Sequence, residues 1–292
     1  MSATRTVLPE VSTRRRRTDQ VMRGSLVAAT VIALVPLILI LYYLLKKGVS
    51  AWGRSGFFTS DPNGNFFGNP GGIRSAVLGT LEIIALASLI AIPTGIGVAL
   101  YLVEYGKQGT FAKIVRYFVD VMTGVPSIVF GLFIYIVLVL GHVGGSFTGW
   151  KGAIAIALLM LPVVTRASEV VLLLVPDSLR EAALALGAPR WRVVTRIVLP
   201  TAASGLVTGS LLAVARGMGE TAPLLFTAGA TFVATADLGQ QMNNLPVQIF
   251  TDITSPRAEI ISRAWGAAMA LVVIVLILNL VARLISRRSR LA

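Results

Sequence analysis

Six long apolar runs, separated by shorter polar segments, dominate this sequence and leave few folds open to it. They occupy about residues 25–45, 75–102, 117–140, 152–175, 201–229 and 264–285. A helix needs about 20 predominantly apolar residues to cross a hydrocarbon layer ~30 Å thick, and each run meets that length. Because a bilayer offers no partners to exposed backbone polar groups, such runs cross it as helices. The sequence therefore predicts an all-α integral membrane protein with six transmembrane helices.

The residue types missing from the chain exclude several kinds of chemistry. Hydrophobic residues make up 55% of the 292 positions and charged residues 13%, so a soluble fold could not bury the apolar surface. There is no cysteine, and His142 is the single histidine. Disulfides, thiolate metal sites, cysteine nucleophiles and histidine metal clusters are thereby excluded. We expect neither catalytic nor metal-binding residues in this chain.

The start of the chain has some features of a secretory signal. Arg14 to Arg17 and Arg23 precede the first apolar run. That run extends from Ser25 to about Leu45, which is long enough to span a bilayer, and no small-residue cleavage site follows it. We expect an uncleaved first span.

Basic residues outnumber acidic ones by 26 to 13, giving a formal net charge of +13. In a soluble protein this excess would suggest a nucleic-acid partner. Here the charges lie between the apolar runs, and the cytoplasmic loops of membrane proteins are rich in Lys and Arg. With the N-terminus in the cytoplasm, 17 of the 26 basic residues face the cytoplasm and seven face outward. The pattern predicts a multi-pass protein of the cytoplasmic (inner) membrane, with both termini cytoplasmic and no nucleic-acid partner.

The polar segment between the fourth and fifth runs predicts two short helices joined at a turn. Residues 177–200 read DSLREAALALGAPRWRVVTRIVLP. Asp177 or Ser178 can cap the first helix, Gly187 can end it, and Pro189 suits the first turn of the second. Such a helical knob would project into the cytoplasm.

The spacing of this knob resembles the signature of permease subunits of ATP-binding-cassette (ABC) importers of type I. That signature is Glu-Ala-Ala, three residues, Gly, nine residues and Ile-x-Leu-Pro, and every named position matches: Glu181, Ala182, Ala183, Gly187, Ile197, Leu199 and Pro200. In that family the knob is the coupling helix, which docks in a groove on the ATPase subunit and transmits its closure to the membrane helices. The alternative is an ordinary amphipathic connector with a solvated face.

The chain carries no nucleotide-binding loop of its own. Such a loop reads G-x-x-x-x-G-K-[ST], and the nearest candidate, Gly106-Lys107, is followed by Gln108 and lacks the earlier glycine. The resemblance then implies that a separate ATPase subunit binds ATP and Mg²⁺ and hydrolyses the ATP. We expect this chain to be a transporter subunit, to have no cofactor and not to be an enzyme.

Two pairs of opposite charges lie inside the apolar runs. Arg166 and Glu169 are three residues apart in the fourth run, and Arg216 and Glu220 are four apart in the fifth, so each pair shares one helical face. A charge near the bilayer centre costs about 2.5–3.5 kcal/mol on insertion scales, and it therefore needs a partner or a water-filled lining. Guanidinium groups bind oxyanions with two parallel hydrogen bonds. The pairs are either contacts for a passing anion or interhelical salt bridges, and the residues alone leave both open.

Other polar and small residues are expected to be less informative. Glu82 and Asp120 lie near the ends of predicted spans, where hydration at the interface is expected. His142 is expected in a solvated loop. Gly205 and Gly209 allow close helix packing, which would suit a subunit interface.

Three further segments resemble the phosphate-specific permeases of this importer class. They are residues 124–132 (GVPSIVFGL), 161–166 (LPVVTR) and 215–229 (ARGMGETAPLLFTAG), within a resemblance covering roughly residues 70–286. It implies that the two Arg–Glu pairs act in transport. It also implies an assembly with a second homologous permease chain, two cytoplasmic ATPase subunits and an extracytoplasmic phosphate-binding protein.

Other functions stay open at this point. Importers of phosphonate, sulfate and molybdate share the coupling signature, and two arginines indicate an anion without naming it. An ATP-independent channel or secondary transporter would not need the segment from Glu181 to Pro200, and a membrane scaffold or sensor would not need the buried charge pairs.

The predicted organisation has four parts. Residues 1–24 form a basic cytoplasmic tail that anchors the topology, the alternative being a regulatory role or binding to membrane lipid. Residues 25–74 form the first span and an extracytoplasmic loop. Residues 75–286 form the importer core, with the coupling loop at 177–200. Residues 287–292 form a second cytoplasmic tail.

Overall fold

The computed structural model describes most of the chain, in three stretches: residues 13–63, 68–106 and 108–288. Within these stretches the regular structure is helical, apart from one antiparallel bridge between Pro62 and Gly71. Residues 1–12 and 289–292 of the predicted tails lie outside the described residues, as does Lys107. The prediction of an all-α fold is confirmed.

The chain divides into two compact units, Met1–Lys46 and Lys47–Ala292. The described part of the first unit is a single helix, α1 (Thr13–Trp52), whose last turns belong to the second unit. This helix begins within the arginine-rich segment and continues past Lys46 and Lys47, so it is longer than the predicted span. Arginine and lysine are good helix formers, which explains how a helix extends beyond its apolar run.

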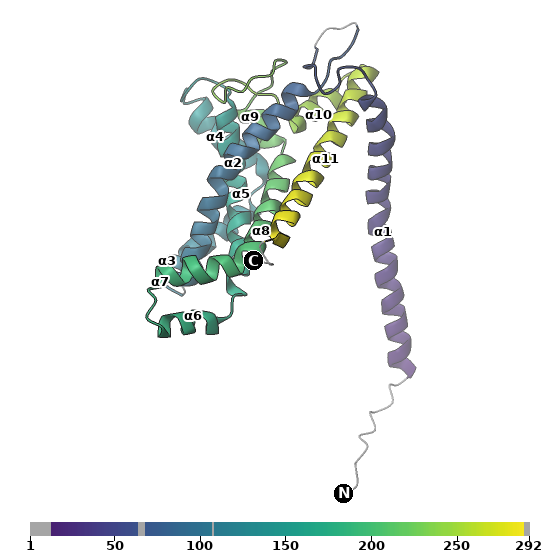
Figure 1. The fold of residues 1–292 in the computed structure, drawn as a ribbon. Helices are drawn as coiled ribbons and strands as arrows, with labels where there is room; N and C mark the ends of the chain where they lie inside the picture. The colour runs from purple at the N-terminus through teal and green to yellow at the C-terminus, as the bar shows by residue number, and fades with distance from the viewer. Residues whose placement is uncertain (1–12, 64–67, 107, 289–292) are drawn as a thin grey trace. The chain divides into compact units, whose positions relative to one another are not determined.

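Four long helices form the body of the second unit: α2 (Arg74–Leu100), α5 (Gly149–Leu173), α8 (Leu199–Met218) and α11 (Ala258–Arg288). α5 packs against both α2 and α8 (Figure 1). Small residues allow this packing. A Cβ added at Gly95 of α2 would lie 2.8 Å from the Cβ of Val164 on α5, so a glycine is required for the two backbones to approach this closely.

The third predicted span, 117–140, is wrong as a single straight helix. The chain forms α3 (Thr110–Gly124) and α4 (Ser127–Ile134), and α4 continues into the π-helical turn η2 (Tyr135–Val139). The axes of the two parts differ by 102°. Val125 has extended backbone angles, as the residue before a proline usually does, and Pro126 has no N–H to continue the helical bonding. Of the described helices, five are long and apolar enough to cross a membrane, and the bent pair brings the number to six.

The fifth predicted span, 201–229, is displaced along the chain. Its helix runs from Arg190 to Met218 as α7 (Arg190–Val193), the π-helical η3 (Val194–Val198) and α8. The wider π turn comes directly before Pro200, at a place where a regular α-helix would lose a backbone hydrogen bond. The helix ends at Gly219, and the separate α9 (Ala222–Thr227) follows.

The segment between α9 and α11 contains one short helix, α10 (Leu245–Ile253). Asn244 caps it by accepting a hydrogen bond from Val247 N at 3.0 Å, and Pro246 occupies the first turn. α10 packs against α11 and contacts α2. We call this side of the second unit the α10 end, and the opposite side, where α6 (Asp177–Ala185) lies, the α6 end (Figure 1).

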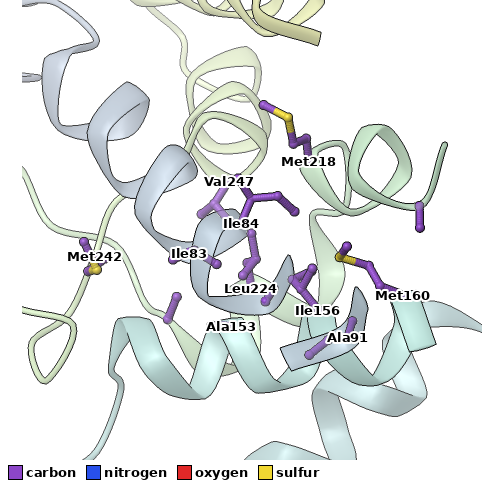
Figure 2. Close-up of a cluster of buried hydrophobic side chains, with 14 of the residues drawn as sticks. Ile83, Ile84, Ala91, Ala153, Ile156, Met160, Met218, Leu224, Met242 and Val247 are labelled. Atoms are coloured by element: carbon purple, nitrogen blue, oxygen red, sulfur yellow. The ribbon is translucent and has the colours of Figure 1, made fainter. Parts of the chain in front are cut away.

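The main apolar core lies between α2, α5 and the segments at the α10 end. Figure 2 shows its side chains, which include Ile83, Ile84, Ala91, Ala153, Ile156, Met160, Met218, Leu224, Met242 and Val247. A second cluster at the α6 end joins α2 to α5, α6 and α8 and includes Ala99, Leu172, Ala183 and Val198. The two clusters hold α5 and α8, which carry Arg166, Glu169 and Arg216.

Candidate functional site

Arg166 and Glu169 of α5 form the ion pair that their spacing predicts. Arg166 Nη1 donates to Glu169 Oε2 at 2.5 Å. The Glu169 side chain is only 7% exposed, whereas that of Arg166 is 31% exposed. A buried carboxylate of this kind needs more than one donor, because each of its oxygens has lost water.

The second donor to Glu169 comes from α3, where the sequence analysis expected no site. Arg116 Nε donates to Glu169 Oε1 at 2.7 Å. Asp120, one turn further along α3, pairs through Oδ1 with Arg166 Nη2. Arg116 thus lies within α3, and Asp120, although 61% exposed as expected for a hydrated residue, also forms an ion pair; the sequence predicted neither contact. Their i, i+4 spacing on an amphipathic helix was the available signal, since it places both on one face.

These four side chains form what we call the α3–α5 charge cluster: Arg116, Asp120, Arg166 and Glu169. Two positive and two negative groups balance, which offsets the cost of burial. The cluster is open on one side, because the Asp120 side chain is 61% exposed. An anion arriving from that side would meet the partly exposed arginines, with Asp120 the partner most easily displaced.

Arg216 and Glu220 also pair, but more loosely. Arg216 Nε lies 3.7 Å from Glu220 Oε1, beyond hydrogen-bond range, and the Arg216 side chain is 52% exposed. Glu220 does not share a helical face with Arg216 as predicted, because α8 ends at Met218 and Gly219 turns the chain. The pair therefore forms across a helix end, and the guanidinium keeps donors free for another partner.

The structure does not bring the two Arg–Glu pairs together. Gly209 of α8 faces Ala167 of α5, since a Cβ at Gly209 would lie 2.7 Å from Ala167 Cβ. The two helices are antiparallel, so both arginines lie on the same side of this contact, Arg216 seven residues past Gly209 and Arg166 one residue before Ala167. At a rise of 1.5 Å per residue, they are roughly 9 Å apart along the bundle axis. The two arginines therefore lie at different depths.

The same contact corrects the expectation for the two spaced glycines. A Cβ at Gly205 would lie 2.5 Å from Val171 Cγ1, so Gly205 also faces α5. The two glycines thus pack helices within this chain, and the subunit interface proposed for them is wrong.

The coupling segment begins with the predicted short helix, α6. Gly187 follows it with φ +78°, the left-handed conformation typical of a helix C-terminus, and Ala188 N donates to Ala183 O at 3.1 Å to close the turn. The predicted cap is wrong, because Pro176 occupies that position and Asp177 Oδ1 accepts from Arg180 Nη1 at 2.9 Å. The second helix is not short, since it is the start of the fifth span.

The matching positions of the signature divide into buried and exposed ones. Ala183 is buried against the α6-end cluster, and Ile197 and Leu199 are half-buried. Glu181, Ala182, Gly187 and Pro200 are exposed. The helix is thus held to the bundle on one side and open to a partner on the other, with Leu186 at 89% exposure beside it.

A cavity of about 660 Å³ lies at the α6 end, beside this helix. It is bounded by the π-helical turn η1 (Tyr101–Gly106), the end of α5, and α6 and α7. Its lining includes the charged residues Glu104, Arg116, Asp177, Arg180, Glu181 and Arg190. Groups of both signs line the cavity, and its volume leaves room for these side chains to change partners.

Two other polar residues have clear positions. Glu82 lies within α2 and is half-buried, and its Oε2 has no hydrogen-bond partner among the described residues. His142 is exposed in the turn after η2 with φ +56°, as expected for a loop. Within the described ranges, no group of three His, Asp or Glu side chains is placed to hold a metal ion.

Comparison with known proteins decides the family. Residues 91–291 match the family described as the binding-protein-dependent transport system inner membrane component. This chain belongs to that family. The chain is also similar to the phosphate transport system permease protein PstA of Yersinia pestis, which is 41% identical over 278 residues covering 94% of this chain and 92% of the relative. PstA 1 of Mycobacterium tuberculosis H37Rv is 40% identical over 291 residues, 98% of this chain and 94% of the relative.

Solved structures agree on the fold. The permease of a MetNI methionine ABC transporter in an inward-facing conformation superposes with a TM-score of 0.58 at 20% identity, covering 73% of this chain and 95% of that one. A chain of a bacterial alginate ABC transporter gives a TM-score of 0.64 at 16% identity, covering 93% and 96%. The chain is therefore a multi-pass permease with the type I ABC importer fold, as predicted.

Proposed function

We propose that this chain is the permease subunit of an ATP-driven importer of inorganic phosphate and forms half of its translocation pathway. The observation that carries the proposal is the placing of two arginines on membrane-spanning helices, each beside a carboxylate that an incoming anion can replace. The two relatives named for phosphate transport, about 40% identical over nearly the whole chain, favour phosphate over the other oxyanions.

The exchange of partners is what makes these arginines suitable for transport. At Arg166, Glu169 is buried and fixed by two donors, whereas Asp120 is mostly exposed. Phosphate displaces Asp120 from the guanidinium and retains the charge-assisted hydrogen bonding. Glu169 remains in place, and its negative charge keeps the anion from binding too tightly to leave.

Arg216 provides a second contact at another depth. Its guanidinium is about half exposed and held only by a 3.7 Å ion pair, so it is available to an anion. With roughly 9 Å between the two arginines along the axis, an anion meets them in succession. The charged residues then form two stations of one pathway, Arg216 toward the α10 end and the α3–α5 charge cluster toward the α6 end.

The remaining parts of the importer follow from the two ends of this unit. The excess of basic residues supports a cytoplasmic location for the α6 end and for both termini. There the exposed face of α6, with Glu181, Ala182 and the apolar Leu186, suits docking by an ATPase subunit that binds ATP and Mg²⁺. The full assembly contains a second homologous permease, two ATPase subunits and a phosphate-binding protein that docks at the α10 end.

Labelled phosphate uptake by proteoliposomes containing the whole importer tests the proposal. Arg216→Gln removes a charged contact worth about 1.5–3 kcal/mol, so uptake should fall by about 10- to 100-fold while the complex still assembles. Arg74→Gln is the matched control, because Arg74 is an exposed arginine at the start of α2. Normal uptake by assembled Arg216→Gln complex would remove the pathway role, and equal competition by sulfate would indicate a general oxyanion importer.

A further inference from the structure

The end of α2 is not regular α-helix. Residues 101–106 form the π-helical turn η1, and such turns occur often at functional sites because their hydrogen bonding is easily rearranged. η1 lies between the coupling helix α6 and the α3–α5 charge cluster. Two guanidinium groups, one from each of these neighbours, bind it.

Arg180 of α6 makes the first connection. Its side chain is only 14% exposed, and Nη2 lies 2.9 Å from Glu104 Oε1 of η1, whose side chain is 12% exposed. The same guanidinium donates to the carbonyl oxygens of Leu172 at 2.9 Å and Val175 at 2.6 Å. One buried side chain therefore ties the coupling helix both to the end of α5 and to η1.

Arg116 of α3 makes the second connection. Its Nη2 donates to Leu102 O of η1 at 3.0 Å, while its Nε donates to Glu169 at 2.7 Å. The same guanidinium therefore holds η1 and the buried carboxylate that positions Arg166. A change in η1 reaches Glu169 through one side chain.

We propose that Arg180, Glu104 and Arg116 form a coupling relay, in which η1 carries movement of the ATPase-docked helix α6 to the α3–α5 charge cluster. They are positioning residues, because they act on the anion through Glu169 and Arg166 rather than by contact. The inference rests on the proposed function, since it presumes an ATPase at α6 and an anion at the cluster.

The cavity beside α6 supports movement of the relay. Its wall includes Glu104, Arg116 and Arg180 together, so all three side chains border open space. Water entering that space can satisfy charged groups while they exchange partners, which a close-packed apolar contact does not allow. Charged contacts beside a cavity can thus adopt two arrangements, as an element that transmits a switch must.

A double-mutant cycle on the reconstituted importer tests the relay. Glu104→Gln and Arg180→Gln are made singly and together, and ATP hydrolysis is measured with and without phosphate-loaded binding protein, per assembled complex. Each single change should lower the stimulated-to-basal ratio by about fivefold or more, the range of typical coupling between sites. The double variant should be no worse than Arg180→Gln alone, because Glu104 acts through Arg180.

Asp177→Asn is the matched control. Asp177 binds the same guanidinium at 2.9 Å, but its side chain is 86% exposed and does not belong to η1. Its stimulation ratio should stay near that of the unaltered importer. If Asp177→Asn lowers the stimulation ratio as much as Glu104→Gln does, then the loss of any carboxylate partner of Arg180 has this effect. The relay through η1 would then be rejected.

Two further outcomes would overturn the relay. The first is a double variant whose stimulation ratio falls by the product of the two single-variant reductions, which means that Glu104 and Arg180 act independently. The second is a parallel fall of basal hydrolysis and of assembled complex, which indicates a structural role only. Failure of the proposed function is distinguishable, because then the unaltered importer itself moves no phosphate, whereas failure of the relay leaves that uptake intact.

Discussion

Glu169→Gln should make the importer hold phosphate more tightly and release it more slowly. In the structure Glu169 accepts from Arg116 Nε at 2.7 Å and from Arg166 Nη1 at 2.5 Å, with its side chain 7% exposed. Glutamine keeps the shape but turns an NH₂ donor toward one of these guanidinium groups. The two arginines are then left with Asp120 as the one carboxylate of the cluster.

The size of the effect follows from burial. Removing one partner of a buried ion pair costs about 3–5 kcal/mol. Here the arginine side chains are 29% and 31% exposed, so water offsets part of the loss, and about 2 kcal/mol is expected. A phosphate ion in the cluster supplies the missing negative charge and regains that energy. Its affinity should then rise by about 30-fold, since 1.4 kcal/mol corresponds to a factor of ten.

Two measurements check this prediction. Equilibrium binding of labelled phosphate to the purified complex in nanodiscs, without the binding protein, should be tighter in Glu169→Gln. The maximal uptake rate in proteoliposomes should fall, because release becomes slower. Glu259→Gln is the control, since its carboxylate is 58% exposed, lies outside the cluster and belongs to an exposed ion pair of the kind that contributes little. Weaker phosphate binding in Glu169→Gln would refute the reasoning, because Glu169 would then help to hold the anion instead of competing with it.

Two further predictions concern packing and buried charge. Gly209→Val should lower the melting temperature of the complex, because its Cβ would lie 2.7 Å from a facing α5 side chain and overpacking costs about 1–3 kcal/mol. Gly97→Val should lower it less, because a Cβ at Gly97 would meet nothing within 4 Å. Asp252→Asn should destabilise the α10 end by about 3–5 kcal/mol, because Arg263 (3% exposed) donates to both Asp252 oxygens at 2.7 Å. Glu259→Gln, whose carboxylate is 58% exposed, should leave the melting curve almost unchanged, and equal shifts for the two acidic residues would contradict the burial argument.

Spans flanked by charged or turn-forming residues could be predicted from the sequence. α2, α5 and α11 lie within a few residues of their apolar runs, because hydropathy alone fixes where such a helix can cross a bilayer. The bend between α3 and α4 could not be located from hydropathy, since Val125 and Pro126 lie inside one predicted span, 117–140. Proline was no guide either. α2 and α5 continue through Pro93 and Pro162, whereas the chain breaks at Pro126.

The charged cluster could be predicted only in part. The spacing of Arg166 and Glu169 within one helix gave their pairing, because neighbours on a helix face meet whatever the tertiary fold. The contribution of Arg116 depends on how α3 lies against α5, which follows from the bend and from packing between segments 53 residues apart. Local patterns carry no information on such a contact. The same holds for Glu104, which reaches Arg180 across 76 residues of sequence.

The contrast between the two kinds of helix contact explains where this permease can move. α5 meets α2 and α8 through small residues, as at Gly95 and Gly209, where less than 3 Å would separate an added Cβ from the facing side chain. Shifting either contact would open voids or create overlap, so these three helices should move together. α3, η1 and α6 are joined to α5 partly by charged side chains beside a cavity of about 660 Å³, where ionic partners can be exchanged. Movement that starts at α6 is therefore expected to separate α3 and η1 from α5, at the α3–α5 charge cluster where Arg166 and Glu169 lie.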